Sequence, residues 1–292
     1  MLCACVDIGS NTTRLLVAEA AAGRLSSVLE RRAFTRIGRD LRATGTISAA
    51  KVDEVAATVA EQAALAQALG VRATRVVATA AIRAALNGPA LCAAIEARAG
   101  VPVDVLGGEE EARLAFVGAT RTLGHPLEGR VAVVDVGGGS SEIAVGTVAG
   151  GVSWAASFKV GSGYLADAYL RSDPPAAAEL HAVSEHAAGV FEGLEVPPPE
   201  RAVAVGGSAT SLRRLAGAVL EPETLQRAIR VLSLDGADEV ARRFDLDPQR
   251  VRLLPAGILI LDAVSRCLGV PLQIGRGGLR EGVCLELAGV GS

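Results

Sequence analysis

The chain contains very little lysine. Its two lysines stand at positions 51 and 159, so arginine carries nearly all of the positive charge of the 292 residues. Arginine guanidinium groups suit two-point contacts with phosphate oxygens, although a bias in genomic base composition would give the same excess. The formal net charge of −3 provides no overall attraction to nucleic acid or to acidic membranes. A binding site for a polyanion must therefore be a local basic groove.

The cysteines and histidines lack the spacings of metal sites. The cysteines show no paired C-x-x-C spacing, and the histidines lack the i, i+4 spacing of a helical zinc site. Cys3 and Cys5 point to one face of the first expected strand, where buried small hydrophobic residues are a simpler interpretation than a metal pair. We therefore expect no zinc site. The residues concerned are Cys3, Cys5, Cys92, Cys267, Cys284, His125, His181 and His186.

Long apolar runs are also missing. The longest, residues 253–264, contains Asp262 and is shorter than the roughly 20 residues that span a membrane. The chain enters its first expected strand at about Leu2, so we expect no signal peptide and a cytoplasmic protein without a membrane partner. Half of the residues are apolar, and the length suffices for two domains with sizeable cores.

Three common catalytic signatures do not occur. Without a GxxxxGK[ST] loop the chain is not a Walker-type NTPase. A G-x-S-x-G nucleophile elbow and an H-E-x-x-H zinc motif are missing as well. The chemistry must therefore rest on a different set of residues.

The most informative stretch of the sequence is residues 131–147. An apolar run ends in Asp135, Gly137, Gly138, Gly139 and Ser140, and a second apolar run follows Glu142. This pattern predicts two strands joined by a tight turn whose backbone N–H groups can hold an anion. Two carboxylates beside a phosphate-binding turn suit a hard divalent cation, usually Mg²⁺, shared with phosphate oxygens. An ordinary glycine-rich hairpin is the alternative for this stretch taken alone.

Two further stretches repeat this design. Residues 5–18 read as a strand, the turn Asp7-Ile8-Gly9-Ser10-Asn11-Thr12, and a second strand. Residues 202–212 read as a strand followed by Gly206-Gly207-Ser208, where the turn opens into a helix. Three turns of phosphate-binding type in one chain are much harder to obtain by chance than one.

Together these segments resemble the exopolyphosphatase/guanosine pentaphosphate phosphatase (Ppx/GppA) family, a branch of the acetate kinase–sugar kinase–Hsp70–actin superfamily. The resemblance covers nearly the whole chain. It is carried by the D-x-G-S-N turn at 7–11, residues 78–83, 108–114, the D-x-G-G-G-S-x-E turn at 135–142, and residues 206–208, 254–257 and 278–282.

The resemblance implies an α/β fold of two actin-like (ribonuclease H-like) domains with a cleft between them. We expect an N-terminal domain at residues 1–124 and a C-terminal domain at 125–292. His125 to Gly129 contains the turn residues of a hinge. The final helix, at about 279–288, is expected to pack back on the first domain.

The resemblance also implies roles for single residues. An arginine at the position of Arg83 lies near the substrate phosphates in the family. The glutamate directly before Ala-Arg-Leu, here Glu111, acts as the general base. Adjacent residues lie about 100° apart around a helix, so Glu110 is the alternative if the register slips by one. Three acidic residues in the first turn of a helix also stabilise it through the helix dipole, without any catalytic role.

The expected metal is Mg²⁺, or Mn²⁺, held by Asp135 and Glu142 against the terminal phosphate, with Asp7 contributing through water. Arg83 and the three turns would bind the phosphoryl groups. The expected phosphate-binding turn residues are Gly9, Ser10, Asn11, Thr12, Gly137, Gly138, Gly139, Ser140, Gly207 and Ser208.

We expect an exopolyphosphatase that releases orthophosphate from the end of inorganic polyphosphate. Hydrolysis of guanosine pentaphosphate is the alternative within the family. A sugar or acetate kinase would need an Asp base in place of Glu111, and a non-catalytic sensor would show substitution at Glu111, Asp135 or Glu142. Longer family members carry extra C-terminal helical domains. These domains add length to the polyphosphate channel. We therefore expect either a preference for short polyphosphate or a homodimer whose interface supplies the corresponding channel walls.

Overall fold

The computed structural model describes residues 1–21 and 24–289. Backbone contacts divide the chain into two compact units. The first contains Met1–Thr122 together with the chain from Gly277 onward, and the second contains Leu123–Arg276. The second unit therefore ends at Arg276 and does not continue to the C-terminus, because the last helix belongs to the first unit.

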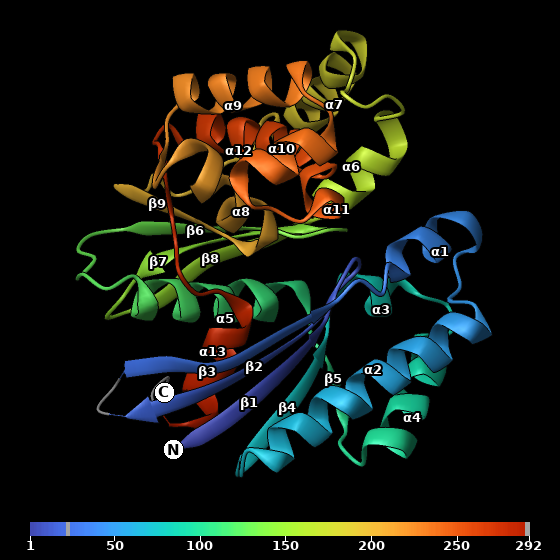
Figure 1. Cartoon of the computed structure of the whole chain (residues 1–292). Coiled ribbons are helices and arrows are strands. Elements are labelled where there is room, and N and C mark those ends of the chain that lie inside the picture. The colour runs from blue at the N-terminus through green and yellow to red at the C-terminus, as the bar shows by residue number, and fades with distance from the viewer. Residues whose placement is uncertain (22–23, 290–292) are drawn as a thin grey trace. The chain divides into compact units, whose positions relative to one another are not determined.

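The first unit is built on a sheet with the strand order β3-β2-β1-β4-β5 in the described residues (Figure 1). Strand β1 pairs antiparallel with β2 and parallel with β4, and β4 pairs parallel with β5. Its elements are β1 (Leu2–Ile8), β2 (Thr13–Ala21), β3 (Arg24–Ala33), α1 (Ile37–Thr44), α2 (Ala49–Ala68), β4 (Ala73–Ala78), α3 (Ala80–Ala84), α4 (Gly88–Ala99), β5 (Val103–Val105), α5 (Gly108–Thr122) and α13 (Leu279–Leu287).

Strand β1 is buried on both faces, as its nearly continuous apolar sequence predicts. Ala4, Val6 and Ile8 face a core completed by α2 and α4. Cys3 and Cys5 face the opposite core, which contains side chains of α5 and α13. The alternation of side chains along a strand thus allows one strand to support helices on both sides.

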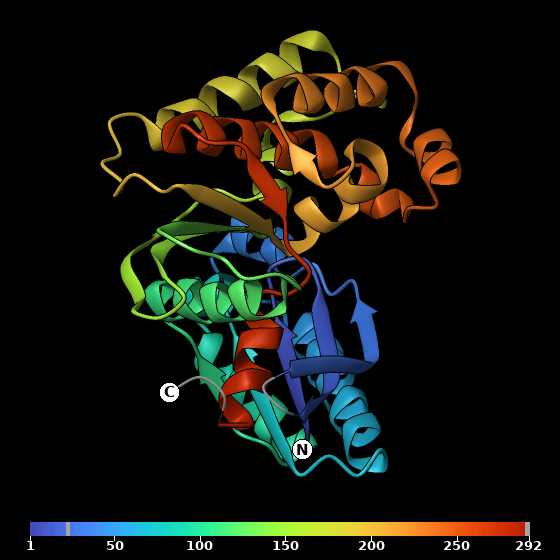
Figure 2. The same cartoon turned by 90° about the vertical axis from the view of Figure 1, so that its left-hand side faces the viewer.

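Helices α5 and α13 cross at very close range through glycines (Figure 1 and Figure 2). A Cβ atom added to Gly282 would lie 2.0 Å from the carbonyl oxygen of Leu114, and one added to Gly118 would lie 1.9 Å from the carbonyl oxygen of Gly278. The two backbones could not approach this closely with any side chain present. This contact gives a physical reason for the glycines of residues 278–282.

The second unit is built on a sheet with the strand order β10-β11-β9-β6-β7-β8 in the described residues. Strand β6 pairs antiparallel with β7 and parallel with β9. Its elements are β6 (Val131–Val136), β7 (Ser141–Thr147), β8 (Gly151–Phe158), α6 (Ser162–Tyr169), α7 (Ala177–Phe191), β9 (Arg201–Val205), α8 (Gly206–Ala216), β10 (Val219–Leu220), α9 (Pro222–Leu234), α10 (Ala237–Phe244), α11 (Pro248–Val251), α12 (Leu254–Leu268) and β11 (Leu272–Ile274).

Several helix boundaries differ from the prediction. Proline is well placed in the first turn of a helix, so residues 172–175 predict a helix start there, whereas α7 begins at Ala177. The carboxylate of Glu179 accepts hydrogen bonds from backbone N–H groups of the preceding segment, including that of Ala176 (2.9 Å), so this segment folds back on the helix start. Ser48, as a residue type that favours the N-cap position, predicts the start of α2, but its hydroxyl donates to Asp40 (2.6 Å) rather than capping the helix.

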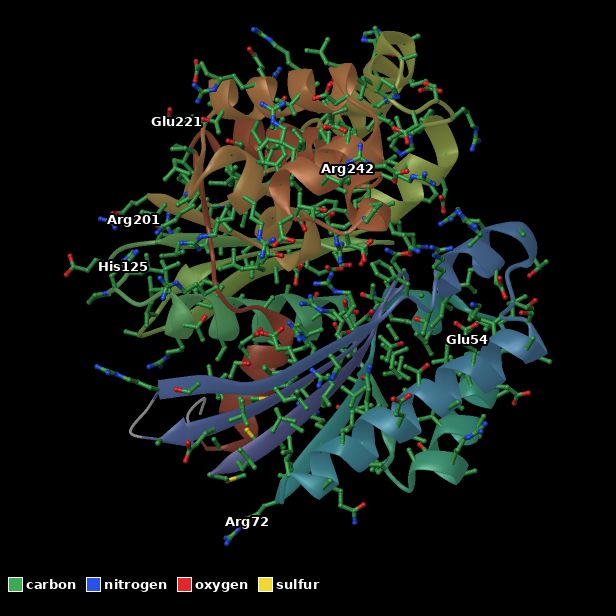
Figure 3. All side chains as sticks on the ribbon, in the orientation of Figure 1. Glu54, Arg72, His125, Arg201, Glu221 and Arg242 are labelled. Carbon is green, nitrogen blue, oxygen red and sulfur yellow. The ribbon has the colours of Figure 1, made fainter. Side chains whose placement is uncertain are left out.

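Charged side chains project outward from each unit, such as Glu54 and Arg72 from the first and Arg201 and Arg242 from the second (Figure 3). His125 is also exposed, in the segment expected to be a hinge. Among residues 1–21 and 24–289, no helix combines the length and apolar character that crossing a membrane requires.

Candidate active site

The two predicted hairpin turns have the same construction, one in each unit. In the first, the N–H group of Gly9 donates to the carbonyl oxygen of Thr12 (3.0 Å). In the second, the N–H group of Gly137 donates to the carbonyl oxygen of Ser140 (3.0 Å). Each turn follows a strand whose last two residues are an aspartate and an apolar residue. Each turn then leads into the antiparallel partner of that strand.

Each turn contains backbone N–H groups that the described structure leaves without a hydrogen bond. Those of Ser10 and Asn11 in the first turn, and of Gly138 and Gly139 in the second, donate no hydrogen bond to any residue that the structure describes. A buried or half-buried N–H group normally finds a partner. Both turns can therefore hold an anion such as a phosphoryl group.

In the second unit, the third turn lies beside the second one. Strands β6 and β9 are parallel neighbours in which Asp135 pairs with Val205, so residues 137–140 and 206–208 follow the same edge of the sheet. Gly206 has φ +84°, and a Cβ atom there would lie 2.3 Å from the Asp135 Oδ1 atom. Only glycine allows α8 to begin this close to the carboxylate. The sequence analysis named Gly207 and Ser208 and did not identify Gly206 as a site residue.

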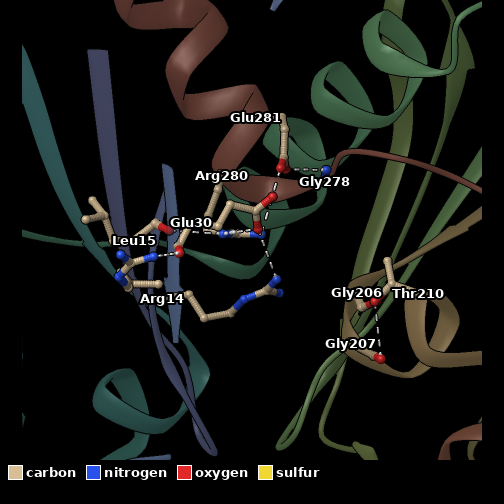
Figure 4. Close-up of polar contacts among 10 residues, drawn as sticks. Arg14, Leu15, Glu30, Gly206, Gly207, Thr210, Gly278, Arg280 and Glu281 are labelled. Atoms are coloured by element: carbon tan, nitrogen blue, oxygen red, sulfur yellow. Dashed lines mark hydrogen bonds and ion pairs between the residues drawn. The ribbon is translucent and has the colours of Figure 1, made fainter. Parts of the chain in front are cut away.

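The start of α8 is an uncapped helix N-terminus. Val205 occupies the N-cap position and provides no side-chain acceptor, so the first N–H groups of the helix, at Gly206 to Ser208, have no capping partner. The Thr210 hydroxyl donates back to the Gly206 carbonyl oxygen (2.9 Å; Figure 4). Such a terminus, with the positive end of the helix dipole, favours phosphate binding.

Neighbouring glycines allow the second unit's turns to pack tightly. A Cβ atom on Gly161 would lie 2.5 Å from the carbonyl carbon of Gly138, and one on Gly257 would lie 2.4 Å from the Ser208 hydroxyl oxygen. Gly257 belongs to residues 254–257, so this contact explains one of the motifs noted in the sequence. Ser208 is almost completely buried, and its hydroxyl is therefore poorly placed to act as a nucleophile.

Asp135 and Glu142 stand directly opposite each other on β6 and β7. Side chains of directly opposed residues lie on the same face of a sheet, so the two carboxylates are brought together at the turn. The Ser157 hydroxyl, from the neighbouring strand β8, donates to Glu142 Oε1 (2.8 Å) and orients that carboxylate. The sequence analysis did not identify Ser157.

This pair of carboxylates fits Mg²⁺. Within residues 1–21 and 24–289, no three acidic, histidine or cysteine side chains gather as a complete metal site. Two carboxylates beside a phosphate-binding turn are nevertheless the donor set that Mg²⁺ commonly uses, since it keeps several water ligands and shares the oxygens of a phosphate substrate. Asp135 and Glu142 are the residues that would hold it.

In the first unit, the position that corresponds to Glu142 carries the opposite charge. Asp7 on β1 pairs with Arg14 on β2, as Asp135 pairs with Glu142. Arg14 also lies 3.9 Å from Glu30 (Figure 4). Burial raises the pKa of Asp7, while the charges of Arg280 and Arg14 act against this shift. The Asp7 Oδ1 atom is buried without a hydrogen-bond partner in the described residues, which fits a water or cation ligand.

Arg280 is a buried cation that the sequence analysis did not single out. It projects from α13, and its guanidinium lies within 3.3 Å of Glu30 Oε2 and 3.4 Å of the Leu15 carbonyl oxygen (Figure 4). Glu281, the next residue of α13, lies 3.8 Å away. A buried arginine next to two carboxylates and close to Asp7 fixes the charge distribution beneath the first turn.

Arg83 and Glu111 are brought together at the same edge of the first unit's sheet as the turn at residues 9–12. The carboxyl ends of β1, β4 and β5 coincide there, and α3 and α5 follow β4 and β5. The Arg83 guanidinium forms an ion pair with the buried Glu111 carboxylate and also donates to the Leu106 carbonyl oxygen. Arg83 lies in the short helix α3, which has five residues.

Glu110 has a different set of partners. Arg113 donates to both of its carboxylate oxygens (2.7 and 2.8 Å) and also pairs with Glu286 of α13. The hydrogen bond from Arg113 lowers the pKa of Glu110. Because Glu110 is directed toward α13, the register of α5 leaves Glu111 as the glutamate that faces Arg83.

Arg250 is a second arginine that the sequence analysis missed. It is buried, and a Cβ atom on Gly207 would lie 2.3 Å from its Nη1 atom. The guanidinium thus lies on the backbone at the start of α8. There it adds positive charge beside the positive end of the helix dipole. Its only sequence signal is its place shortly before residues 254–257.

The sequence matches the Ppx/GppA phosphatase family over residues 16–289, and the chain belongs to this family. It is 30% identical to exopolyphosphatase 1 of Mycobacterium leprae, over 96% of this chain and 88% of that protein. It is 29% identical to exopolyphosphatase 2 of Mycobacterium tuberculosis, over 98% of both chains. The protein is thus a phosphoanhydride hydrolase of the Ppx/GppA type.

Solved structures agree with this assignment. The Ppx/GppA family member of Aquifex aeolicus has a TM-score of 0.83 at 28% identity, covering 99% of this chain and 97% of that one. An exopolyphosphatase of Cytophaga hutchinsonii has a TM-score of 0.87 at 20% identity, with full coverage of both chains, and supports the fold. The expected α/β fold of two actin-like domains is confirmed.

Proposed function

We propose that the protein is a metal-dependent exopolyphosphatase. The observation that carries this proposal is the opposed pair of Asp135 and Glu142 beside two adjacent phosphate-binding turns. The pair is found in a chain whose named relatives include exopolyphosphatases. The names of these relatives favour polyphosphate as the substrate.

Binding of the phosphate chain would rest on backbone donors. In the second unit, the N–H groups of residues 138–139 and the first turn of α8 would bind phosphoryl oxygens, with Arg250 adding a positive charge at the same place. In the first unit, the turn at residues 9–12 would bind in the same manner. Donors fixed by the fold need no reorganisation as charge develops in the transition state.

Asp135 and Glu142 would hold Mg²⁺, which would supply charge neutralisation at the phosphoryl group that is transferred to water. Ser157 would keep the Glu142 carboxylate in position. Asp7 would orient a water molecule through its buried Oδ1 atom.

Glu111 would accept the proton of the attacking water. Its ion pair with Arg83 fixes the orientation of the carboxylate, because the guanidinium is itself held by the Leu106 carbonyl oxygen. In the same mechanism Arg83 would also contact the substrate phosphate.

The proposal is tested by Mg²⁺-dependent orthophosphate release from short polyphosphate, long polyphosphate and guanosine pentaphosphate, with EDTA and Mn²⁺ as further conditions. We expect release from polyphosphate that EDTA abolishes and that Asp135→Asn reduces by at least about 10²-fold, since the metal would lose one of its two carboxylates. Faster release from guanosine pentaphosphate would instead favour the alternative activity. No release from any substrate with either metal would contradict the proposal.

Two further features belong to the proposal. Preference for short polyphosphate chains would follow if the chain-binding surface is limited, and a homodimer would extend it. A cytoplasmic location would place the enzyme with its phosphate substrates. Sedimentation of the purified protein reports its oligomeric state directly.

A further inference from the structure

Arg36 has an unusual backbone conformation next to the first phosphate-binding turn. It precedes α1 with φ 50° and ψ 38°, in the left-handed region. In the described part of the chain, Asp245 is the other non-glycine residue with positive φ. This region is disfavoured for residues with a Cβ atom and readily adopted by glycine. At this position glycine would suit the fold better than arginine.

The segment around Arg36 is clamped to the turn by three hydrogen bonds. The Arg36 N–H group donates to the Asn11 carbonyl oxygen (3.0 Å), and the Gly38 N–H group donates to the Ser10 carbonyl oxygen (2.8 Å). The hydroxyl groups of Thr35 and Thr13 share a buried hydrogen bond (3.1 Å). Arg36 therefore has a fixed position against the turn, although the turn lies more than 20 residues away in sequence.

The Arg36 side chain is half-buried, and its guanidinium makes no hydrogen bond or ion pair with any residue among 1–21 and 24–289. The nearby acidic side chains are already engaged. Asp40 accepts hydrogen bonds from the Ser48 hydroxyl and N–H groups, and Glu30 pairs with Arg14 and Arg280. The positive charge of Arg36 is thus left for a ligand.

We propose that Arg36 binds a phosphoryl group of the substrate, next to the group that the first turn holds, and so contributes to specificity for phosphoanhydride chains. The inference rests on the proposed function and deepens it. A guanidinium can contact two oxygens of one phosphoryl group. Retention of arginine in a conformation that suits glycine is then explained by binding rather than by folding.

The test uses Arg36→Gly, because glycine suits the backbone at this position. The variant should melt no lower than the wild type, since it loses an unfavourable Cβ and no internal hydrogen bond of the side chain. The KM for polyphosphate should rise about tenfold or more, as expected for loss of a charged contact, with kcat little changed. Higher salt should raise KM less in the variant than in the wild type. The control variant Arg98→Gln removes an exposed arginine of α4 and should change neither the melting temperature nor the KM for polyphosphate.

Binding of fluorescently labelled polyphosphate, without turnover, separates this inference from the proposed function. If wild type binds polyphosphate but hydrolyses nothing, the proposed function fails, and weaker binding by Arg36→Gly still supports the role of Arg36. Equal binding and equal KM for wild type and Arg36→Gly would overturn the inference. A lower melting temperature of Arg36→Gly, with unchanged binding, would show that Arg36 is structural. Wild type that neither binds nor hydrolyses polyphosphate would overturn both.

Discussion

Asp7 and Asp135 occupy the same position in the two hairpins, yet their cross-strand partners differ. Asp135 faces Glu142, whereas Asp7 faces Arg14. Two carboxylates attract a cation, whereas a guanidinium opposite a carboxylate offsets part of its negative charge. We therefore assign metal binding to the second unit, and phosphate and water contacts to the first. The residue opposite the aspartate, Glu142 in one hairpin and Arg14 in the other, decides this division.

Ser157 provides a test of the metal pair at the residue scale. Ser157→Ala removes the hydroxyl that donates to Glu142, so the carboxylate should be less well oriented. We expect the Mg²⁺ concentration for half-maximal activity to rise roughly 10- to 100-fold, as for other residues that orient metal ligands.

The matched control is Ser153→Ala on the same strand, whose hydroxyl donates to the Val145 carbonyl oxygen (3.1 Å) and not to Glu142. It should leave the Mg²⁺ dependence unchanged. An equal shift in both variants would mean that β8, and not the contact with Glu142, is responsible.

At the residue scale, the sequence identifies groups within continuous motifs. Asp135, Glu142 and the glycines of the turns were predicted because they lie within a few residues of one another. Arg250 and Ser157 reach their places only through the fold. The arginine-rich stretch at residues 31–42, which includes Arg36, suggests contacts with a phosphate chain from its composition, with solvated surface arginines as the alternative. The position of Arg36 against the first turn depends on hydrogen bonds from its own segment to Ser10 and Asn11.

At the scale of elements, close contacts between helices explain glycines that the sequence shows without a reason. In the first unit, Gly282 of α13 contacts the backbone of α5 at Leu114. The helix that carries Glu111 is thereby fixed by the final helix. The ion pairs of Glu286 with Arg113 and Arg75 add a second connection to α13.

Gly282→Ala tests this packing. The added methyl group would collide with the Leu114 carbonyl oxygen, so the helices must separate, and we expect a loss of about 1–3 kcal/mol in the free energy of unfolding. Denaturant unfolding measures this loss.

Gly189→Ala is the control within a helix of the second unit, since no atom lies within 4 Å of the added Cβ. Alanine has the higher helix propensity, so this variant should gain roughly 0.5–1 kcal/mol. A Gly282→Ala variant as stable as the wild type would show that α5 and α13 are not held at close range.

Strands were predicted better than helix boundaries. The buried apolar runs of β1, β2, β6 and β7 leave little choice of conformation. By contrast, the sequence of residues 248–268 predicts one helix, whereas the structure divides it into α11 and α12, with Pro255 in the first turn of α12. The sequence analysis also omitted α4, because its helical pattern follows so closely on the short α3.

At the scale of the molecule, each unit repeats one plan: a hairpin whose turn is of the phosphate-binding type, followed by parallel strands whose carboxyl ends lie at the same edge. The units then differ in chemistry. The first carries Arg83, Glu111 and Arg36, and the second carries the carboxylate pair and Arg250. Family membership was predictable from the motifs, whereas the return of the last helix to the first unit depends on contacts distant in sequence.

The most direct test of the catalytic assignment compares Glu111→Gln with Glu109→Gln in orthophosphate release from polyphosphate at saturating Mg²⁺. Both changes remove one negative charge from the first turn of α5, but Glu109 is exposed whereas Glu111 is buried against Arg83. We predict that Glu111→Gln lowers kcat by about 10² to 10⁴-fold, the usual contribution of a general base, and that Glu109→Gln stays near the wild-type rate. Full activity of Glu111→Gln would contradict the mechanism.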